Sequence, residues 1–299
     1  MANLRIIDVS PVIYAGSRDT RKNIEGALLE TVGGFKPQQI PSGGLAFLWN
    51  IIYEYGNSDT LIFCFDRPPT IKKAMWPDYK SGRTHPEGVM SQKDLAEELV
   101  RECGFLCCAK EGYEADDFIY DLCMKYKTVF DHIYVHTGDS DMYCVVDTNV
   151  EVVPSSSTAK HITYENFRNT VVLDKVIPYN MLTFEKILNG DKSDNIPPLP
   201  RALVMEMLRV LNTPFNQPRM GKRVFVRTLV EQLFPIALRQ VDLVFPLPMD
   251  ESDLEFDFAI VPNFYKASIW GYLIGNRNFA IPKKIPMDIA EKRASLFDR

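Results

Sequence analysis

Uninterrupted apolar runs alternate along this chain with longer segments in which apolar residues recur at helical spacing. The strand-like runs lie at 4–8, 59–66, 105–109 and 131–141, and the helical segments lie at 43–56, 91–103 and directly after 114. A continuous apolar strand is typical of a parallel sheet that is covered on both faces. The alternation therefore predicts an α/β fold, with a mostly parallel central sheet and helices on both faces.

The later part of the chain has a different pattern. After about residue 175 the strand signal fades and mainly helical patterns continue. A length of 299 residues allows two domains. We expect a core at 1–199 and a mainly helical region at 200–299 that ends in a loose tail.

Targeting signals and cysteine usage favour the cytoplasm. The chain has no apolar run of about 18 residues, and its N-terminus lacks the pattern of a signal peptide. The six cysteines form no CxxC pair and mostly lie within apolar runs, as reduced core residues do. We therefore expect a cytoplasmic protein with no zinc site and no membrane partner.

Acidic residues follow the predicted strands. Asp8, Asp66 and Asp139 each stand at the end of a strand-like run, and Glu114 follows another. In open parallel sheets, sites form at the carboxyl ends of the strands. We expect these acids to meet at one edge of the sheet.

The stretch "EADD" at 114–117 has two readings. Acidic residues in a first helical turn meet the positive end of the helix dipole, so the stretch fits an ordinary helix start. Alternatively, its acids face those of other strand ends across one cleft. Two more groups have suitable spacing: Asp139 with Asp141, and Asp191 with Asp194 in "GDKSD".

Nine carboxylates in one cleft would repel one another strongly without a counter-charge. They are Asp8, Asp66, Glu114, Asp116, Asp117, Asp139, Asp141, Asp191 and Asp194. Hard divalent cations prefer oxygen ligands, and a pair of them can promote phosphodiester cleavage. We expect a site for two Mg²⁺ ions, for which Mn²⁺ can substitute.

Four motifs resemble, in order and spacing, those of the 5′-nuclease superfamily over roughly residues 4–200. They are "FDRPPTIKKAMWPDYKSGR", "EADD", "TGDSDMYCVV" and "GDKSDNIP". The superfamily includes flap endonucleases, the 5′-exonuclease domain of bacterial DNA polymerase I and phage 5′-exonucleases. The stretch "IIDVS" is most similar to the bacteriophage ribonuclease H branch. The resemblance implies a PIN-like 5′-nuclease core.

The resemblance also implies two groups of metal ligands. The first group holds one ion directly or through water, and comprises Asp8, Asp66, Glu114 and Asp116. The second group surrounds the other ion, mostly through water, and comprises Asp117, Asp139, Asp141, Asp191 and Asp194. Asp139 and Asp141 are thereby expected to be catalytic.

A basic stretch follows the second predicted strand: Arg67, Lys72, Lys73, Lys80 and Arg83. From the residues alone, it fits a solvated loop as well as a polyanion-binding segment. Neutralising the nine acids would change the formal net charge from −5 to +4, so the acidic composition is compatible with a polyanionic partner.

By resemblance, this stretch begins a helical arch at about 67–93 that accepts a single-stranded 5′ end. Lys80 and Arg83 would contact the scissile phosphate and stabilise the transition state. Tyr79 and Trp76 would stack on bases, although Trp76 equally fits a core anchor. The Pro, Gly and Lys content leaves little to bury, so we expect residues 67–90 to be mobile without DNA.

The sequence departs from the family pattern after the last aspartates. Cellular members have a Gly-rich helix-hairpin-helix there, often with K⁺, whereas "IPPLPRALVMEML" has no glycine. We therefore do not expect that hairpin or its K⁺ ion. Duplex contacts would fall to basic residues for which a solvated helix face is the alternative: Arg201, Arg209, Arg219, Lys222, Arg223 and Arg227.

These features predict a monomeric, metal-dependent 5′-3′ exonuclease or flap endonuclease with ribonuclease H-like activity. It would hydrolyse RNA–DNA or DNA from 5′ ends and at flaps, as in primer removal during replication, in the host cytoplasm if the source is a phage. Two alternatives stay open: a catalytically silent protein that binds branched DNA, and a PIN-type ribonuclease acting on single-stranded RNA. Leu296 and Phe297 in the tail either pack inside the fold or dock on a sliding clamp.

Overall fold

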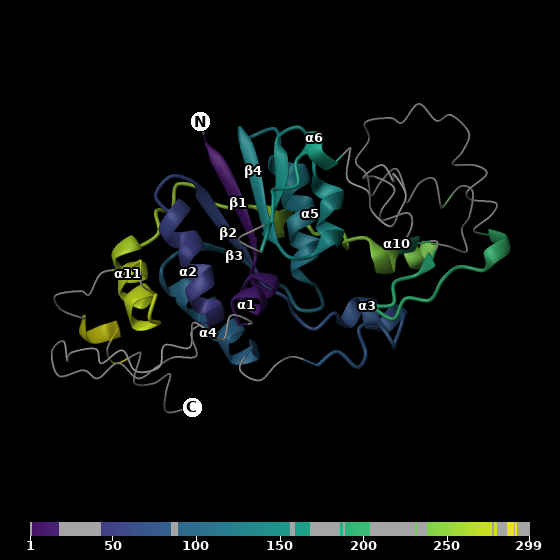
Figure 1. Ribbon diagram of the computed structural model, residues 1–299, viewed down its shortest axis with the longest axis horizontal. Helices are drawn as coiled ribbons and strands as arrows, with labels where there is room; N and C mark the ends of the chain where they lie inside the picture. Colours follow the sequence, from purple (N-terminus) through teal and green to yellow (C-terminus); the bar gives the residue numbers. More distant parts are fainter. Residues whose placement is uncertain are drawn as a thin grey trace.

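A parallel sheet of five strands forms the centre of the described part of the chain (Figure 1). The structure is a computed structural model that describes residues 2–17, 43–84, 89–155, 159–167, 186–187, 189–203, 231, 238–276, 278–279, 286–289 and 291. The strands are β1 (Asn3–Asp8), β2 (Thr60–Cys64), β3 (Leu106–Cys108), β4 (His132–Thr137) and β5 (Val150–Pro154). Their spatial order is β3-β2-β1-β4-β5, and each pairing is parallel.

This order makes β1 and β4 the centre of the sheet and the place where the chain changes direction. From β1 the chain builds outward through β2 and β3, and it then returns to the other side of β1 to form β4 and β5. Ligands of open α/β sheets bind outside the carboxyl ends of the strands at such a switch point. The fold therefore favours a ligand site at the residues that follow β1 and β4.

Helices cover both faces of the sheet. The described helices are α1 (Val9–Ser17), α2 (Gly43–Tyr55), α3 (Thr70–Met75), α4 (Val89–Glu102), α5 (Ala115–Tyr126), α6 (Tyr164–Phe167), α10 (Leu238–Val244) and α11 (Phe264–Leu273). Two short 3₁₀ helices are also present, η2 (Ser140–Val145) and η5 (Glu251–Leu254). Within the described residues, we find no helix that is both apolar enough and long enough to span a membrane.

Alternate strand residues supply the two hydrophobic cores. On one face, Ile7 and Phe63 pack with apolar residues of α1, α2, α4 and α11. On the other face, Ile6 and Ile62 pack with α5 and the residues around it. This alternation explains why the strands are apolar throughout, because both of their faces are buried.

The predicted α/β architecture is confirmed, including all of its predicted strands and helices before residue 130. Within the sheet and its first helix, two described elements were not predicted. One is α1, which begins directly after Asp8, and the other is β5. The sequence of β5, "VEVVP", is short and carries Glu151, so its strand signal was weak.

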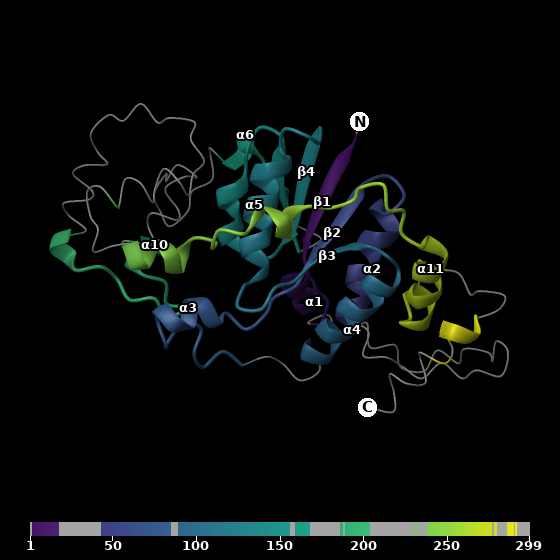
Figure 2. The ribbon, with the colours of Figure 1, turned by 180° about the vertical axis from the view of Figure 1, so that it is seen from behind.

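The chain after α10 runs along the outside of α5 before it reaches α11 (Figure 2). We call residues 245–258 the strap. Asp117 Oδ1 accepts a hydrogen bond from Leu247 N at 2.5 Å, and Asp121 Oδ2 accepts one from Met249 N at 2.8 Å. Further along, α11 packs on the core, where Trp49 Nε1 donates to Ala267 O at 2.8 Å. The described residues of the C-terminal third thus contact the core, while the predicted boundary near 199 stays a prediction.

Candidate active site

Three predicted acids lie at the carboxyl edge of the sheet. Asp8 ends β1, Asp66 stands two residues after β2, and Asp139 stands two residues after β4. Because β1 pairs with both β2 and β4, the three acids follow neighbouring strands. Asp8 and Asp139 flank the switch point of the sheet.

Asp8 and Asp116 occupy the most unfavourable electrostatic positions of this edge. Burial raises the pKa of Asp8 well above its ordinary value, and the neighbouring carboxylates of Asp66 and Asp139 raise it further. Burial also raises the pKa of Asp116, as do Asp139 and Asp8. Thr137 Oγ1 donates to Asp8 Oδ2 at 2.8 Å, but no cation neutralises this carboxylate through a direct ion pair among the described residues. Such mutual repulsion is relieved when a cation binds.

Asp66 is held by three donors. Ala115 N donates to its Oδ1 at 2.9 Å, Ser10 Oγ donates to Oδ2, and Lys93 Nζ lies 3.4 Å from Oδ2. Burial raises the pKa of Asp66, but Lys93 and the two hydrogen bonds outweigh burial, so the net shift is downward. Asp66 is therefore ionised and its orientation is fixed.

Glu114 caps α5 and faces the basic arch residues. Its side chain and that of Asp117 form a reciprocal capping box at the start of the helix. Tyr79 Oη donates to Glu114 at 2.8 Å, and Lys80 Nζ lies 2.6 Å from the other oxygen. Lys72 Nζ lies 3.4 Å from Glu114. Burial raises the pKa of this carboxyl, but the two lysines outweigh it and lower the pKa.

Asp117 was predicted as a ligand of the second ion, but its contacts favour a structural role. It is completely buried. Its Oδ2 accepts from Glu114 N at 2.8 Å, and its Oδ1 accepts from Leu247 N in the strap. Both oxygens are thus committed to backbone donors, which would otherwise be buried without partners.

The second predicted group gathers around Lys186. Its Nζ contacts Asp141 Oδ1 and lies 2.6 Å from Asp191 Oδ2. Burial and Asp139 raise the pKa of Asp141 to about 6, although Lys186 lowers it. Asp191 also accepts two hydrogen bonds from Ser193, from N at 2.8 Å and from Oγ at 2.5 Å.

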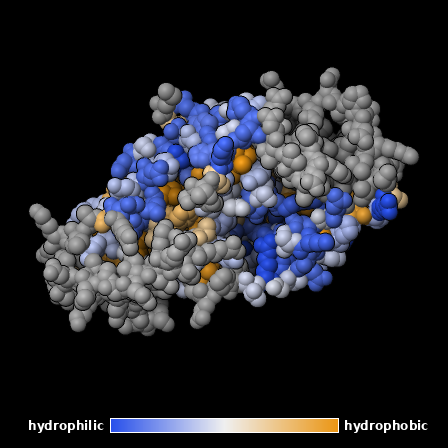
Figure 3. Space-filling view, viewed as in Figure 1, coloured by the Kyte–Doolittle hydropathy of each residue, from blue (hydrophilic) through white to orange (hydrophobic). Residues whose placement is uncertain are grey.

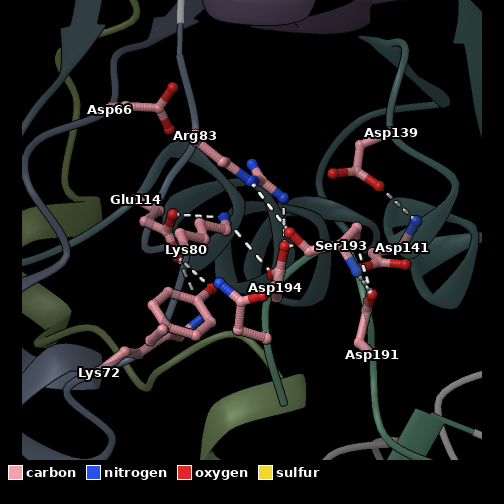
Figure 4. A network of polar contacts seen from close by, with 12 residues as sticks. Asp66, Lys72, Lys80, Arg83, Glu114, Asp139, Asp141, Asp191, Ser193 and Asp194 are labelled. Carbon is pink, nitrogen blue, oxygen red and sulfur yellow. Dashed lines mark hydrogen bonds and ion pairs between the residues drawn. The ribbon is translucent and has the colours of Figure 1, made fainter.

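Asp194 joins this group to the arch, as Figure 4 shows. Arg83 Nη2 contacts its Oδ1, and Lys80 Nζ lies 3.7 Å from its Oδ2. Lys80 therefore lies between Glu114 and Asp194 and bridges the two groups of acids. Burial opposes the positive charge of Lys80, but these acids outweigh burial and raise its pKa.

A cleft of about 360 Å³ opens beside the second group, with Asp116 of the first group on its wall. Its acidic lining comes from Asp116, Asp141, Asp191 and Asp194, and Lys186 and Tyr79 also contribute. The cleft has the size of a small-molecule site rather than a duplex groove.

The donors in this cleft fit hard divalent cations. Carboxylate oxygens are the ligands that Mg²⁺ and Mn²⁺ prefer. As the side chains stand, no three acidic, histidine or cysteine side chains of the described residues are close enough together to hold an ion. Lys80, Lys93 and Lys186 lie among the acids and pair with their oxygens. A cation at this edge would compete with these amines for the carboxylate oxygens.

The residues predicted to contact nucleic acid differ in their exposure to solvent. Lys73 and Arg201 are exposed, and hydrophilic residues gather over the region of α3 in Figure 3. Arg67 pairs with Glu97 at 2.7 Å. Lys72 and Tyr79 are buried, so Tyr79 does not present its ring for base stacking in this arrangement. Arg209, Arg219, Lys222, Arg223, Arg227, Leu296 and Phe297 lie outside the described residues.

Trp76 follows the core-anchor alternative here. It packs with Tyr79, Ile196 and Leu243, and Arg239 lies over its ring at 5.0 Å. The expectation that residues 67–90 have little to bury is wrong for this part of the arch, because the aromatic residues of the basic stretch pack against α10. Figure 1 shows α3 and α10 side by side, away from the sheet.

Sequence reasoning missed several residues of the site. Lys93 and Lys186 lie in helical segments, where a single lysine is usually solvated. Ser10 and Thr137 follow or end strands beside Asp8 and Asp139, and their position at the strand ends was the only available signal.

Comparison with known families identifies the chain. A family model described as 5′-3′ exonuclease, N-terminal resolvase-like domain, matches residues 6–173. The chain belongs to this family. The match covers the end of β1, all of β2, β3, β4 and β5, and the acids from Asp8 to Asp141.

Curated proteins of this 5′-3′ exonuclease family are similar to the chain at modest identity. A 5′-3′ exonuclease of Mycoplasma pneumoniae is 28% identical over 207 residues, which are 66% of this chain and 67% of that protein. DNA polymerase I of Caldicellulosiruptor bescii is 32% identical over 165 residues, which are 53% of this chain and 19% of that protein. The chain thus matches about two thirds of the first relative and a small part of the polymerase.

Solved structures of the family give a weaker likeness. One described as divalent metal ions (zinc) bound to T5 5′-exonuclease has a TM-score of 0.49 and 15% identity, over 99% of this chain and 98% of that chain. This likeness is too weak to support an inference, and the predicted affinity to the phage branch stays a prediction.

Proposed function

We propose that this protein is a divalent-metal-dependent 5′ nuclease that hydrolyses phosphodiester bonds of RNA–DNA or DNA from 5′ ends and at flaps. One observation carries the proposal. Carboxylates from β1, β2, the start of α5, the end of β4 and the 191–194 turn converge on one edge of the sheet in a member of the 5′-3′ exonuclease family. An acidic cluster at that edge serves a phosphodiester cleavage site better than it serves stability, because it costs electrostatic energy.

The residues proposed to hold the ions are the two groups that the family resemblance implies, without Asp117, whose oxygens accept backbone N–H groups. Asp8, Asp66, Glu114 and Asp116 would hold one ion, and Asp139, Asp141, Asp191 and Asp194 would surround a second. Two Mg²⁺ ions would activate a water and stabilise the leaving oxygen of the cleaved phosphodiester. Mn²⁺ is expected to substitute, because it prefers the same oxygen ligands.

The basic side chains would contact the phosphate once cations are bound by these acids. Lys80 and Arg83 neutralise Glu114 and Asp194 in this arrangement. If cations took over this neutralisation, the two side chains would become available to a phosphate at the same place. A phosphate held there would gain stabilisation of the charge that develops on its oxygens.

The substrate class rests on the arch and on the relatives. A nuclease acting on a free 5′ end fits a basic segment docked beside the acids. The similarity to part of DNA polymerase I supports a role in replication, with primer removal as its form. Lys73, Arg201 and the basic residues at 219–227 are proposed to contact the nucleic acid. We also propose that the protein is a monomer in the cytoplasm. Leu296 and Phe297 are proposed to dock on a sliding clamp.

A panel of labelled substrates tests this proposal. The panel comprises a 5′ flap, a nicked duplex, a blunt duplex, an RNA–DNA hybrid and single-stranded RNA, each with Mg²⁺ and with EDTA. We expect Mg²⁺-dependent cleavage of the flap and of the hybrid from their 5′ ends. Flap binding without any cleavage would favour the catalytically silent alternative, and preferred cutting of single-stranded RNA would favour the PIN-type alternative.

A further inference from the structure

Two tight turns interlock at the edge of the proposed site. The acidic hairpin is residues 191–196, closed by hydrogen bonds in both directions between the backbones of Asp191 and Ile196, at 2.9 and 2.8 Å. The basic turn is residues 76–83 and carries Lys80 and Arg83. Lys80 N donates to Asp194 O at 3.0 Å, which joins the two turns through their backbones.

Asn195 makes most of the uncharged contacts between these turns. Its side-chain Nδ2 donates to Asp78 O at 3.1 Å, to Ser81 O at 2.8 Å and to Ser81 Oγ at 3.2 Å. Its own carbonyl oxygen accepts from Trp76 Nε1 at 2.8 Å. One residue therefore binds the basic turn on both sides of Lys80.

The backbone explains why asparagine suits this position. Asn195 has a φ of 58°, in the left-handed region that Asn tolerates better than most residues. Lys80, at the centre of the basic turn, also has a positive φ, of 51°. A non-glycine residue in this conformation persists only when its surroundings hold it there. The Asn195 amide binds the residues on each side of Lys80 and so supplies part of that constraint.

The Asn195 contacts differ from the other contacts between the two turns because they involve no charged side chain. Lys80 and Arg83 meet Glu114 and Asp194 through ion pairs, and these pairs would be exchanged when cations and a phosphate enter. The hydrogen bonds of Asn195 join a neutral amide to neutral oxygens, so their strength does not depend on that exchange. They can hold the basic turn in place while its charged side chains change partners.

We propose that Asn195 is a positioning residue that fixes Lys80 of the basic turn over the acids during cleavage. The inference rests on the proposed function. Asn195 does not reach the acids and acts through Lys80. A small misplacement of a catalytic group is sufficient to slow a reaction by about 100-fold.

Asn195 is exposed, so its removal is expected to leave the fold intact. Asn195→Gly is the main variant, because glycine accepts the positive φ and removes only the amide. Asn195→Asp is the second variant, because it keeps the size but cannot donate. The matched control is Asn166→Gly, which removes another exposed amide that donates to a backbone oxygen, His161 O at 2.6 Å, away from the site.

The first readout is single-turnover cleavage of a 5′ flap at saturating enzyme, beside flap affinity. We expect Asn195→Gly to slow cleavage by about 10- to 100-fold, with flap affinity within about threefold of the parent. In a Lys80→Ala background the same change should cost less than about threefold, because the residue it positions is gone. An equal loss in both backgrounds would overturn the proposal, as would a loss of affinity alone.

The second readout does not need activity. Trp49 and Trp270 are fully buried, whereas Trp76 is partly exposed and touches Asn195. The difference in acrylamide quenching between the parent and Trp76→Phe isolates the Trp76 signal. We expect Asn195→Gly and Asn195→Asp to increase quenching of Trp76, and Asn166→Gly to leave it unchanged.

These readouts separate the inference from the proposed function. If the parent cleaves none of the 5′ substrates, the proposed function fails, and the Trp76 signal still tests whether Asn195 holds the turn. If Trp76 quenching and cleavage are both unchanged in the two Asn195 variants, the positioning role is contradicted.

Discussion

Asp116 and Asp117 are adjacent in the first turn of α5, yet their carboxylates have opposite surroundings. Asp116 faces Asp8 and Asp139, which raise its pKa together with burial. Asp117 accepts two backbone N–H groups and lies 3.8 Å from Lys72. Burial raises the pKa of Asp117 as well, but Lys72 and the two backbone donors lower it, so its charge is better compensated than that of Asp116.

The two asparagine variants should therefore have opposite effects on stability in EDTA at neutral pH. Asp116→Asn removes a repelled charge, and we expect the free energy of unfolding to rise by about 1 kcal/mol or more. Asp117→Asn removes an acceptor from a buried backbone donor, and we expect it to fall by about 1–3 kcal/mol. Urea unfolding of both variants measures this. A fall for Asp116→Asn would show that its charge is not under strain.

Lys80 is a second single residue with a predicted effect. Its amine lies between the carboxylates of Glu114 and Asp194. Lys80→Ala should slow single-turnover flap cleavage by about 100- to 1,000-fold, as the loss of one donor to a developing charge does elsewhere. Flap affinity should fall only modestly, since other basic residues contact phosphates. Lys73→Ala, which removes an exposed lysine of α3, is the comparison. Unchanged cleavage at saturating Lys80→Ala enzyme would leave Lys80 as a solvated arch residue.

Among the elements, β1 and β4 carry a buried polar pair on the face that packs against α2. Arg5 Nη1 lies 3.0 Å from His136 Nε2, pairs with Asp59 at 2.5 Å and lies against the ring of Tyr55. The guanidinium can only donate, so His136 accepts at Nε2 and is neutral. Burial lowers the pKa of His136 to about 3, and the charges of Arg5 and His161 lower it further.

This pair predicts acid sensitivity of the sheet. In the unfolded chain a histidine has a pKa of about 6.5, so between about pH 6.5 and 3 the unfolded state binds a proton that the folded state does not. Stability should therefore fall as the pH falls through this window, and the share of His136 is about 2 kcal/mol at pH 5. His136→Gln keeps an acceptor for Arg5 but does not titrate.

Unfolding free energies between pH 8 and 4 test the prediction. The curve of His136→Gln should be flatter than that of the parent below pH 6.5. Parallel curves would show that His136 is protonated in the folded protein.

At the scale of the whole molecule, the sequence was sufficient to predict the features that depend on residues close together in the chain. Asp8, Asp66 and Asp139 could be placed together because each follows a recognisable strand, and parallel strands end at one edge. Lys93 could not be placed, because it contacts Asp66, which is 27 residues away, and Lys186 joins nearby Asp191 to Asp141, which is 45 residues away. Residue spacing carries no information about such partners.

The contacts of the strap and of the interlocked turns also join residues that are far apart in the sequence. Asp117 looked like a metal ligand because "EADD" carries no sign that Leu247 N lies against it. Tyr79 and Trp76 looked available to bases because the arch sequence does not show that Leu243 of α10 packs on them. Family resemblance gave the order of the motifs, but not which side chains the rest of the chain had already engaged.

Direct Mn²⁺ binding tests, without knowledge of the substrate, whether the carboxylates at the sheet edge bind divalent ions. Electron paramagnetic resonance of free Mn²⁺ during titration counts the ions bound by the parent and by Asp139→Asn. We expect two ions per parent chain, displaced by Mg²⁺, weaker binding in Asp139→Asn, and flap cleavage in that variant reduced by about 100-fold or more with flap binding retained. A parent chain that binds no Mn²⁺, or an Asp139→Asn chain that binds and cleaves as the parent does, would contradict the account.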